Sequence, residues 1–502
     1  MTDLPPQPPP KGLWATLRQL GPGMIIAGSI VGSGELIATT KVGAEAGFWL
    51  LWLIIIGCVI KVFCQIEFGR YTITWSQTPL KALNSVPGPK LKVNWLVWAW
   101  AFMTVPIIFQ QGGIVGGVGQ ALAISAPLTE QGRSFNEARD GLVQAQVELA
   151  QDRLDTPSAS FVEQENAIAV LAEQVGQMPE PADPYVWTAL IAILTSFLLY
   201  FGRYKLIQAV STVFVGLFSL MTIVTVIMLQ QTSWAVTGAE FSQGLQFSVP
   251  PADPVLGINP IATAFAAFGI IGLGSAELIM YPYWCLEKGY AKLTGKRDGS
   301  SGWIERAKGW VRVLHIDAWG SMVVYTISTV AFYLLGAAVL WRIGLNPAGG
   351  DLVRTLAEMY VPVFGEWASS VFLFGAFAVL YSTFFVAAAG NARMVADGLG
   401  LYGFHANTEA TRMRWTRIIS AVWPLVAFVL YLFVQAPAAM VLAGGIGQGI
   451  MLPLLGIAAL YFRYKRTEEA LVPGRVWDVL LWISFGALCV AGGWTLYANL
   501  FG

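Results

Sequence analysis

Charged side chains are scarce in this chain, and the few present balance one another. Only 12% of the 502 residues are charged, and 30 basic residues match 30 acidic ones. This balance excludes a polyanion such as a nucleic acid as an electrostatic partner. The two histidines and four cysteines show no metal-finger spacing and no secreted disulfide framework. No nucleophile–base pair or nucleotide loop is visible, so we expect neither an enzyme nor a bound cofactor.

Apolar residues dominate the remainder. Hydrophobic residues make up 56% of the chain and the mean hydropathy is +0.61. Apolar runs of bilayer length, about 20 residues, recur from one end to the other. We therefore predict an all-α integral membrane protein with about eleven transmembrane helices. The expected spans are 21–45, 48–74, 94–125, 185–201, 206–230, 258–287, 314–341, 366–394, 416–434, 437–462 and 475–499.

Two stretches fall outside these spans. Residues 1–20 form a proline-rich tail without a signal sequence, which we expect to be disordered. Residues 127–183 carry 11 acidic and 3 basic residues, a net charge of −8, with apolar residues at helical spacing. We interpret this stretch as an external helical hairpin between helices 1–3 (21–126) and helices 4–11 (184–502). It is a solvated excursion resting on the external loops, a cation-attracting antechamber or an oligomer contact.

Basic residues gather in alternate loops, so they fall on one side of the membrane. The loop after the sixth span alone holds seven of them: Lys288, Lys292, Lys296, Arg297, Arg306, Lys308 and Arg312. By the positive-inside rule, the N-terminus is cytoplasmic and the C-terminus external. We expect a bacterial inner or plasma membrane, with membrane lipid and a small ion substrate as partners, and the oligomeric state stays open.

One phrase occurs twice, about half the chain apart. Residues 32–37 read Gly-Ser-Gly-Glu-Leu-Ile, and residues 274–279 read Gly-Ser-Ala-Glu-Leu-Ile. Each copy places a carboxylate, Glu35 or Glu277, inside an apolar span, where a charge costs about 3 kcal/mol or more. The neighbouring glycines weaken the helix and free backbone carbonyls. Two such breaks in corresponding halves indicate the midplane binding site of a secondary transporter.

Further motifs resemble the Nramp family of divalent-metal transporters. Gly21-Pro22-Gly23 and residues 43–48 resemble the opening of the family, and Tyr281-Pro282-Tyr283 stands where the family has Met-Pro-His. The end of the eighth helix and the start of the ninth are also similar, at Ala388, Gly390, Asn391, Asp397, Gly398, 412–417 and Pro424. The resemblance covers most of the chain apart from the hairpin. It implies a LeuT-like fold, with two inverted five-helix repeats plus an eleventh helix.

The functional positions depart from the family. Its first-helix metal motif, Asp-Pro-Gly-Asn, is replaced by Gly32, Ser33, Gly34 and Glu35. Tyr281 and Tyr283 replace the methionine and the histidine of the sixth helix. The acidic pair linked to proton movement in the third helix aligns with Gln110 and Gly113. The resemblance thus implies the family scaffold without the usual proton coupling, and the nearest functional analogy is to Nramp-related magnesium transporters.

The expected binding site surrounds the two glutamates. Its residues are Glu35, Glu277, Gly32, Ser33, Gly34, Leu278 and Tyr281, and further candidates for the cavity lining are Gln110, Gln111, Tyr283 and Gln448. Oxygen ligands suit hard cations such as Mg²⁺, Ca²⁺ and Mn²⁺, and we expect no Met, Cys or His at its centre.

The roles of individual polar residues stay open. Each glutamate is a cation ligand, a proton carrier or a structural cap on the half-helix that follows it. The glutamines line the cavity or join helices to one another. We expect His315 and Asp317 to form a surface ion network.

The leading hypothesis is a transporter or facilitator of Mg²⁺ or Mn²⁺ that works by alternating access. An alternative is a LeuT-like carrier of an organic amine or amino-acid-type solute, with Tyr281, Tyr283 and Trp284 as an aromatic wall. A third is a membrane sensor or scaffold that has lost transport.

Overall fold

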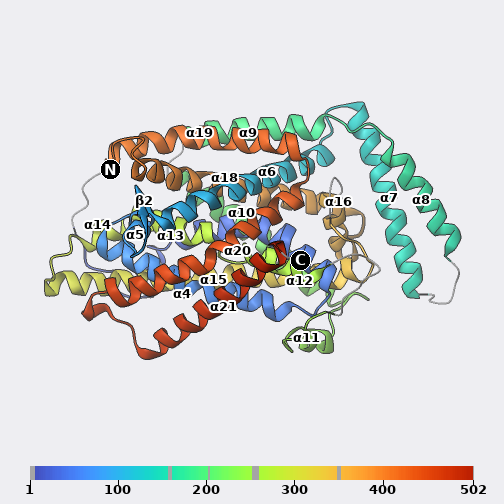
Figure 1. Cartoon of the computed structure of the whole chain (residues 1–502). Coiled ribbons are helices and arrows are strands. Elements are labelled where there is room, and N and C mark those ends of the chain that lie inside the picture. The colour runs from blue at the N-terminus through green and yellow to red at the C-terminus, as the bar shows by residue number, and fades with distance from the viewer. Residues whose placement is uncertain (1–5, 156–160, 202–203, 251–258, 348–351, 501–502) are drawn as a thin grey trace.

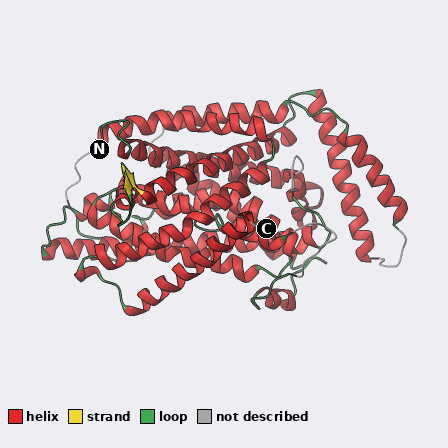
Figure 2. Ribbon diagram, in the orientation of Figure 1, coloured by secondary structure: helices red, strands yellow, loops and turns green. Residues whose placement is uncertain are grey.

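Long helices make up nearly the whole chain in the computed structural model (Figures 1 and 2). The structure describes all residues except 1–5, 156–160, 202–203, 251–258, 348–351 and 501–502. Within the described part, ten helical segments are long and apolar enough to cross a membrane. The uninterrupted ones are α4 (Leu51–Trp75), α6 (Trp95–Ser125), α9 (Asp183–Phe201), α10 (Tyr204–Leu229), α15 (Ser301–Leu335), α18 (Ala368–Leu401), α19 (Glu409–Val434), α20 (Pro437–Tyr461) and α21 (Arg475–Leu500).

The tenth of these segments and one further segment are broken where the repeated phrase occurs. The first consists of α2 (Pro22–Ile30), the π-helix η1 (Ser33–Thr39) and α3 (Thr40–Ala46). The second consists of α12 (Pro260–Phe268) and α13 (Ser275–Lys288), which are each too short to span a bilayer. Between these two, Gly272 adopts φ +61°, a backbone conformation that favours glycine. The second pair supplies the expected eleventh span, and the prediction of an all-α membrane fold is confirmed.

The two broken segments lie against each other in opposite directions. Helix α12 packs on η1 and α3, whereas α13 packs on α2. The breaks themselves are in contact, because a Cβ atom on Gly34 would lie 3.0 Å from the carbonyl oxygen of Ile270. Glycine at this position therefore permits the close approach. Helices α4, α15, α18 and α20 surround the crossing and bury it.

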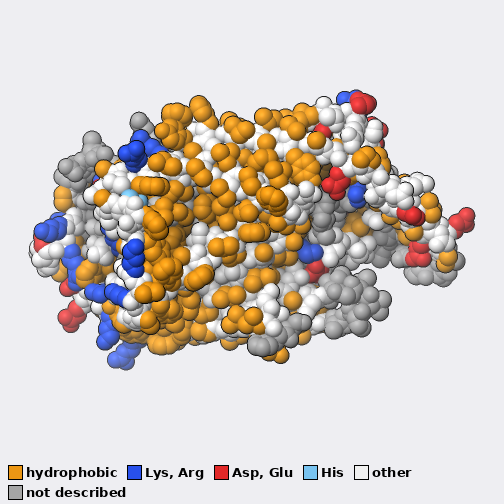
Figure 3. Space-filling view, turned by 45° about the horizontal axis from the view of Figure 1, so that its top comes forward, with side chains coloured by type: hydrophobic (Ala, Val, Ile, Leu, Met, Phe, Trp, Pro, Cys, Tyr) orange, Lys and Arg blue, Asp and Glu red, His pale blue; other side chains and the backbone are white. Residues whose placement is uncertain are grey.

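The two ends of the molecule differ in charge. Lys and Arg side chains gather at the end that holds α5 (Pro79–Asn84) and α14 (Tyr290–Thr294), here called the basic end (Figure 3). Acidic side chains stand out on α7 (Glu130–Asp155) and α8 (Val162–Gly176), which project from the opposite, hairpin end (Figures 1 and 3). An apolar surface covers the helices between them. This division matches the charge asymmetry on which the expected orientation rests.

The hairpin and the tail both contact the helical body. Arg354, on α16 (Leu352–Ala357), pairs with Asp140 of α7 at 2.7 Å. Its guanidinium also donates to Asn136. In the tail, the backbone N–H of Gln7 donates to Leu293 at 2.9 Å, and its carbonyl accepts from Trp310 at 3.2 Å. The expectation of a disordered tail is therefore wrong at Gln7, and residues 1–5 lie outside the described part.

Smaller elements complete the chain between the long helices. A two-residue antiparallel ladder joins β1 and β2 before α6. These elements are α1 (Leu13–Leu17), β1 (Lys90–Leu91), β2 (Val93–Asn94), α11 (Gly238–Gly244), the π-helix η2 (Gly336–Trp341), η4 (Glu358–Tyr360), α17 (Val361–Phe364), η5 (Gly365–Trp367), the π-helix η6 (Phe462–Arg466) and η7 (Glu469–Leu471).

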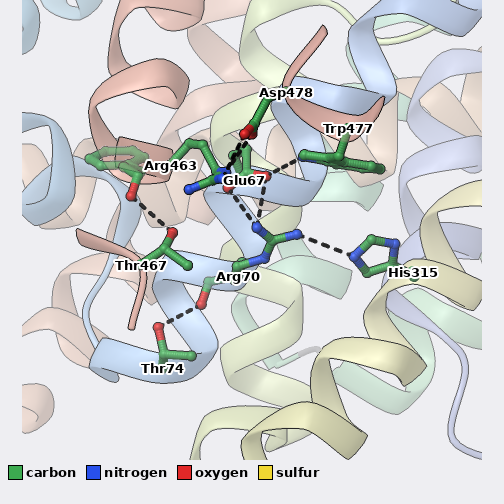
Figure 4. A network of polar contacts seen from close by, with 9 residues as sticks. Glu67, Arg70, Thr74, His315, Arg463, Thr467, Trp477 and Asp478 are labelled. Atoms are coloured by element: carbon green, nitrogen blue, oxygen red, sulfur yellow. Dashed lines mark hydrogen bonds and ion pairs between the residues drawn. The ribbon is translucent and has the colours of Figure 1, made fainter. Parts of the chain in front are cut away.

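A polar network ties the helices together near the basic end (Figure 4). Glu67 of α4 accepts from Trp477 at 2.6 Å and pairs with Arg70 at 3.0 Å. Arg70 reaches His315 of α15 at 3.5 Å. Beside them, η6 is joined to α21 by a bidentate Arg463–Asp478 pair at 2.7 and 2.8 Å. Each charged side chain of this network thus has a partner of opposite sign.

Candidate functional site

Glu35 lies at the point where the two breaks meet. Its side chain is fully buried in the first turn of η1. One carboxylate oxygen, Oε1, accepts from the hydroxyl of Thr329 on α15 at 3.0 Å and from the backbone N–H of Gly272 at 3.4 Å. The other oxygen, Oε2, has no hydrogen-bond partner among the described residues. A buried carboxylate oxygen without a partner is costly, so a bound cation or proton would stabilise it.

Glu277 occupies the corresponding position in the second segment. Its side chain is 9% exposed, and Oε1 accepts from the hydroxyl of Ser29 on α2 at 3.0 Å. The backbone N–H groups of Gly274 and Glu277 also interact with this carboxylate. Glu277 therefore reaches back over the first turn of α13, as a helix cap does. The backbone groups of Gly32 and Glu35 interact with the Glu35 carboxylate in the same way, so the cap interpretation applies to both glutamates.

Gln448 of α20 holds the start of α13. Its side-chain oxygen accepts from the backbone N–H of Ala276 at 3.0 Å, and its backbone carbonyl accepts from Ser275 Oγ at 2.6 Å. Its amide nitrogen donates to Gln110 Oε1 on α6 at 2.8 Å. Gln448 thus reaches the second break directly, whereas Gln110 reaches it through Gln448. Gln111 is also buried, and its Oε1 has no partner in the described part of the chain.

The backbone groups of the other predicted site residues form hydrogen bonds within the first turns of their own helices. The carbonyl of Gly32 accepts from Leu36 N–H at 2.7 Å, and the backbone N–H of Leu278 donates to Gly274 at 3.0 Å. Ser33 is buried at the start of η1. The Gly34 carbonyl accepts from the hydroxyl of Thr39 at 3.0 Å.

The two tyrosines direct their hydroxyl groups to other sites. Tyr281 donates to Asp317 at 2.9 Å, and Tyr283 donates to Asp397 at 2.7 Å. Asp317 also accepts from the backbone N–H groups of Gly21 and Gly23 at 2.9 and 2.6 Å, so it caps the start of α2. With 3% of its surface exposed, Asp317 is buried, and its assignment to a surface ion network is wrong. Asp317 accepts from neutral donors inside the protein, whereas His315 contacts Arg70 of the network in Figure 4.

Two residues of α4 beside the second break were missed by sequence reasoning. A Cβ atom on Gly272 would lie 3.3 Å from Cys58 Sγ, so a thiol stands next to the break. Cys58 was not among the site residues predicted from the sequence. Lys61 is fully buried and donates to the carbonyls of Phe268 and Ile271. A lysine in the middle of an apolar span is itself a functional signal, and it was readable in the sequence.

The arrangement can bind a cation through few protein ligands. The described residues contain no group of three or more His, Cys, Asp or Glu side chains placed to hold a metal ion. One carboxylate with a free oxygen, neighbouring hydroxyls and break carbonyls would leave several coordination positions for water. Such partial coordination suits Mg²⁺, which gives up its water reluctantly.

Comparisons with known proteins agree with this architecture. The model of the Nramp family, Natural resistance-associated macrophage protein-like, matches residues 167–498, more than half of the chain. None of the curated proteins matches the chain.

Solved structures show the same fold. A mutant of the Eremococcus coleocola manganese transporter is 13% identical over 97% of this chain and 88% of its own, with a TM-score of 0.63. The same transporter in complex with an aromatic bis-isothiourea substituted compound covers 98% and 88% at 13% identity and a TM-score of 0.62. MhsT in complex with L-phenylalanine is 14% identical over 94% and 97%, with a TM-score of 0.52.

These likenesses confirm the LeuT-like fold, and the family match confirms the resemblance found in the sequence. The chain therefore belongs to the Nramp family and is a multi-pass membrane transporter rather than an enzyme.

Proposed function

We propose that this transporter moves a hard divalent cation, Mg²⁺ or Mn²⁺, by alternating access and without coupled proton movement. The observation that carries the proposal is the Glu35 carboxylate, which is buried at the contact between the two breaks with one oxygen unpaired. Membership of the Nramp family and the fold shared with a manganese transporter support a divalent ion.

The chemistry of the neighbouring groups favours hard ions. Glu35 is surrounded by the hydroxyl of Thr329 and by the backbone of the second break. Carboxylate, hydroxyl and carbonyl oxygens suit Mg²⁺ and Mn²⁺. The thiol of Cys58 is a soft donor that lies beside this break. Substitution of Cys58 therefore tests whether the transporter prefers hard or soft ions.

The residues of α6, the third membrane span, support transport without proton coupling. Where the family places its acidic pair, α6 carries Gln110 and Gly113. Gln110 is engaged in a hydrogen bond to Gln448, and Gly113 packs against the backbone of α20, where a Cβ atom would lie 2.5 Å from the Pro437 carbonyl. Neither residue carries a titrating proton, so this helix lacks a proton relay of that kind.

The charge distribution supports the proposed orientation. Lys and Arg gather at the basic end, where Gln7 of the tail also binds to Leu293 of α14 (Figures 1 and 3). The positive-inside rule places this end in the cytoplasm and the acidic hairpin outside. The ion would then travel between the hairpin end and the basic end through the crossing of the two breaks.

The test is uptake into liposomes that contain trapped dyes for Mg²⁺ and Mn²⁺, with internal pH followed in parallel. We expect saturable uptake by the wild type with no pH change, and loss of uptake in Glu35→Gln. Glu45→Gln is the matched control, because Glu45 lies on the same broken segment but pairs with Lys41 at 2.9 Å away from the breaks. Acidification that accompanies uptake would refute the uncoupled mechanism. No uptake of any ion by folded protein, together with stabilisation by organic amines, would favour the amine carrier.

A further inference from the structure

Lys61 places a positive charge in the middle of the membrane-spanning helix α4. The side chain is fully buried. Its ammonium group donates to the carbonyl of Phe268 at 2.5 Å and to that of Ile271 at 2.7 Å. Phe268 is the last residue of α12, and Ile271 lies in the break that follows. The ammonium therefore occupies the negative end of a half-helix at the second break.

The sequence of α4 explains how the ammonium reaches this position. Gly57 lies one turn before Lys61 and faces the same side of the helix. A Cβ atom on Gly57 would lie 3.1 Å from the ring of Phe268, so glycine lets α4 approach α12 closely. The Lys61 ammonium then lies 4.4 Å from the centre of the same ring, a cation–π distance. Aromatic ring and carbonyls together form a pocket for one cation.

The first break is capped by a neutral group. There the hydroxyl of Thr383 on α18 lies 3.2 Å from the carbonyl of Gly28 and 3.4 Å from that of Val31. The two half-helix ends thus have different caps, a hydroxyl at the first and an ammonium at the second. A neutral hydrogen-bond donor is therefore enough to cap the end of a half-helix. The positive charge of Lys61 must then have a function other than capping.

In transporters with broken helices, unwound carbonyls and the C-terminal ends of half-helices coordinate the coupling cation. We propose that Lys61 is a tethered cation that occupies this position at the second break, so that the transporter needs no coupling ion there. This inference builds on the proposed transport function. Lys61 also interacts electrostatically with Glu35 and Glu277.

The test is the thermal stability of the purified full-length protein in choline chloride, compared with LiCl, NaCl and KCl at equal ionic strength. The wild type should melt at the same temperature in every salt. Lys61→Ala should melt several degrees lower in choline and recover with increasing Na⁺ or Li⁺, because an ion now fills the vacated pocket. Lys61→Met should lose the same stability without recovery, because its side chain fills the pocket without a charge.

Lys41→Ala is the matched control, since Lys41 is a partly buried lysine that pairs with Glu45 away from the breaks. It should show no ion dependence. If Lys61→Ala melts like the wild type in choline, or folds but recovers with none of the three ions, the proposal is overturned. The melting experiment needs no transport, so a failed uptake assay and a failed ion effect remain distinguishable.

A second variant covers the case in which Lys61→Ala does not fold. Lys61→Gln keeps N–H donors for the two carbonyls but removes the charge. We expect the amide hydrogens of residues 269–274 to exchange faster in this variant than in the wild type when choline is the cation, and to slow again with Na⁺. Exchange equal to that of the wild type in choline would show that the carbonyls need a donor and not a cation, and would overturn the proposal.

Discussion

Asp317 is expected to hold the transporter closed at the basic end. Its two carboxylate oxygens accept from the N–H groups of Gly21 and Gly23 and from the hydroxyl of Tyr281, at 2.6 to 2.9 Å. One side chain of α15 thus joins the start of α2 to α13. If α2 and α13 both move away from α15 to open the site toward the basic end, all three bonds must break.

The size of the effect follows from these three bonds. A hydrogen bond to a charged group contributes about 1.5 kcal/mol at the low end of its range. Asp317→Asn can keep its acceptor oxygen at Oδ2, where it still accepts from Gly23 and Tyr281. It loses the bond from Gly21 and the charge that makes the other two bonds about twice as strong, a total loss of about 3 kcal/mol. Because 1.4 kcal/mol corresponds to about tenfold, the open population should rise by about a hundredfold.

A native cysteine can report this opening. Cys285 is fully buried on α13, one turn beyond Tyr281 and within electrostatic reach of Asp317. Its maleimide alkylation, read at this cysteine by mass spectrometry, should accelerate by about a hundredfold in Asp317→Asn if opening limits access. The control is Asp298→Asn, since Asp298 is an exposed carboxylate that accepts from Ser300 at 2.7 Å. A rate of Cys285 alkylation in Asp317→Asn within twofold of the wild-type rate would refute the role of Asp317 in holding the transporter closed.

Three further results are expected. Burial and a neighbouring aspartate raise the pKa of Glu358, outside the membrane spans, from 4.5 to about 7. The folded state therefore binds a proton that the unfolded chain has released, so the melting temperature should fall as pH rises from about 5 to about 7 and stay level in Glu358→Gln. In Gly269→Ala, the new Cβ atom would lie 1.9 Å from the Gly445 carbonyl oxygen, which forces α12 and α20 apart. This substitution should cost about 3 kcal/mol or more in melting experiments, whereas Gly493→Ala, with open space around it, should not. Cys58→Ser should raise the Cd²⁺ concentration that half-inhibits Mn²⁺ uptake, and an unchanged value would show that the thiol does not contact the ion.

The broken helices were predictable because their signal is local. A carboxylate beside glycines within an apolar run conflicts with an unbroken membrane helix, and this conflict is written into the residues around Glu35 and Glu277 themselves. The same reasoning applied to Lys61 would have identified it, because lysine is equally unfavourable in the middle of α4. Its actual partners could not be read, since they are backbone carbonyls about 200 residues away along the chain.

The remaining differences come from side-chain direction. Tyr281 occupies the position of a metal ligand in the resemblance, yet its hydroxyl extends to Asp317 on another helix. Similarly, Cys58 comes to the second break only because α4 packs its Gly57 face against α12. Sequence spacing shows which residues share a face of a helix, but not which neighbouring helix that face meets. Tertiary packing decides which helix a face meets, and no local sequence pattern encodes that choice.

The π-helix η1 gives the two halves of the transporter unequal mechanical properties. A π-turn contains one residue more than an α-turn, and that extra residue can move along a helix by exchanging hydrogen bonds between adjacent carbonyls. Here the hydroxyls of Thr39 and Thr40 accompany the widened turn by donating to the carbonyls of Gly34 and Glu35. A shift of the π-turn along η1 would therefore rotate the Glu35 carboxylate from one set of neighbouring groups to another. The segment that carries Glu277 begins as a regular α-helix and is fastened by Gln448. The segment that carries Glu35 is therefore adjustable, whereas the segment that carries Glu277 is held in place.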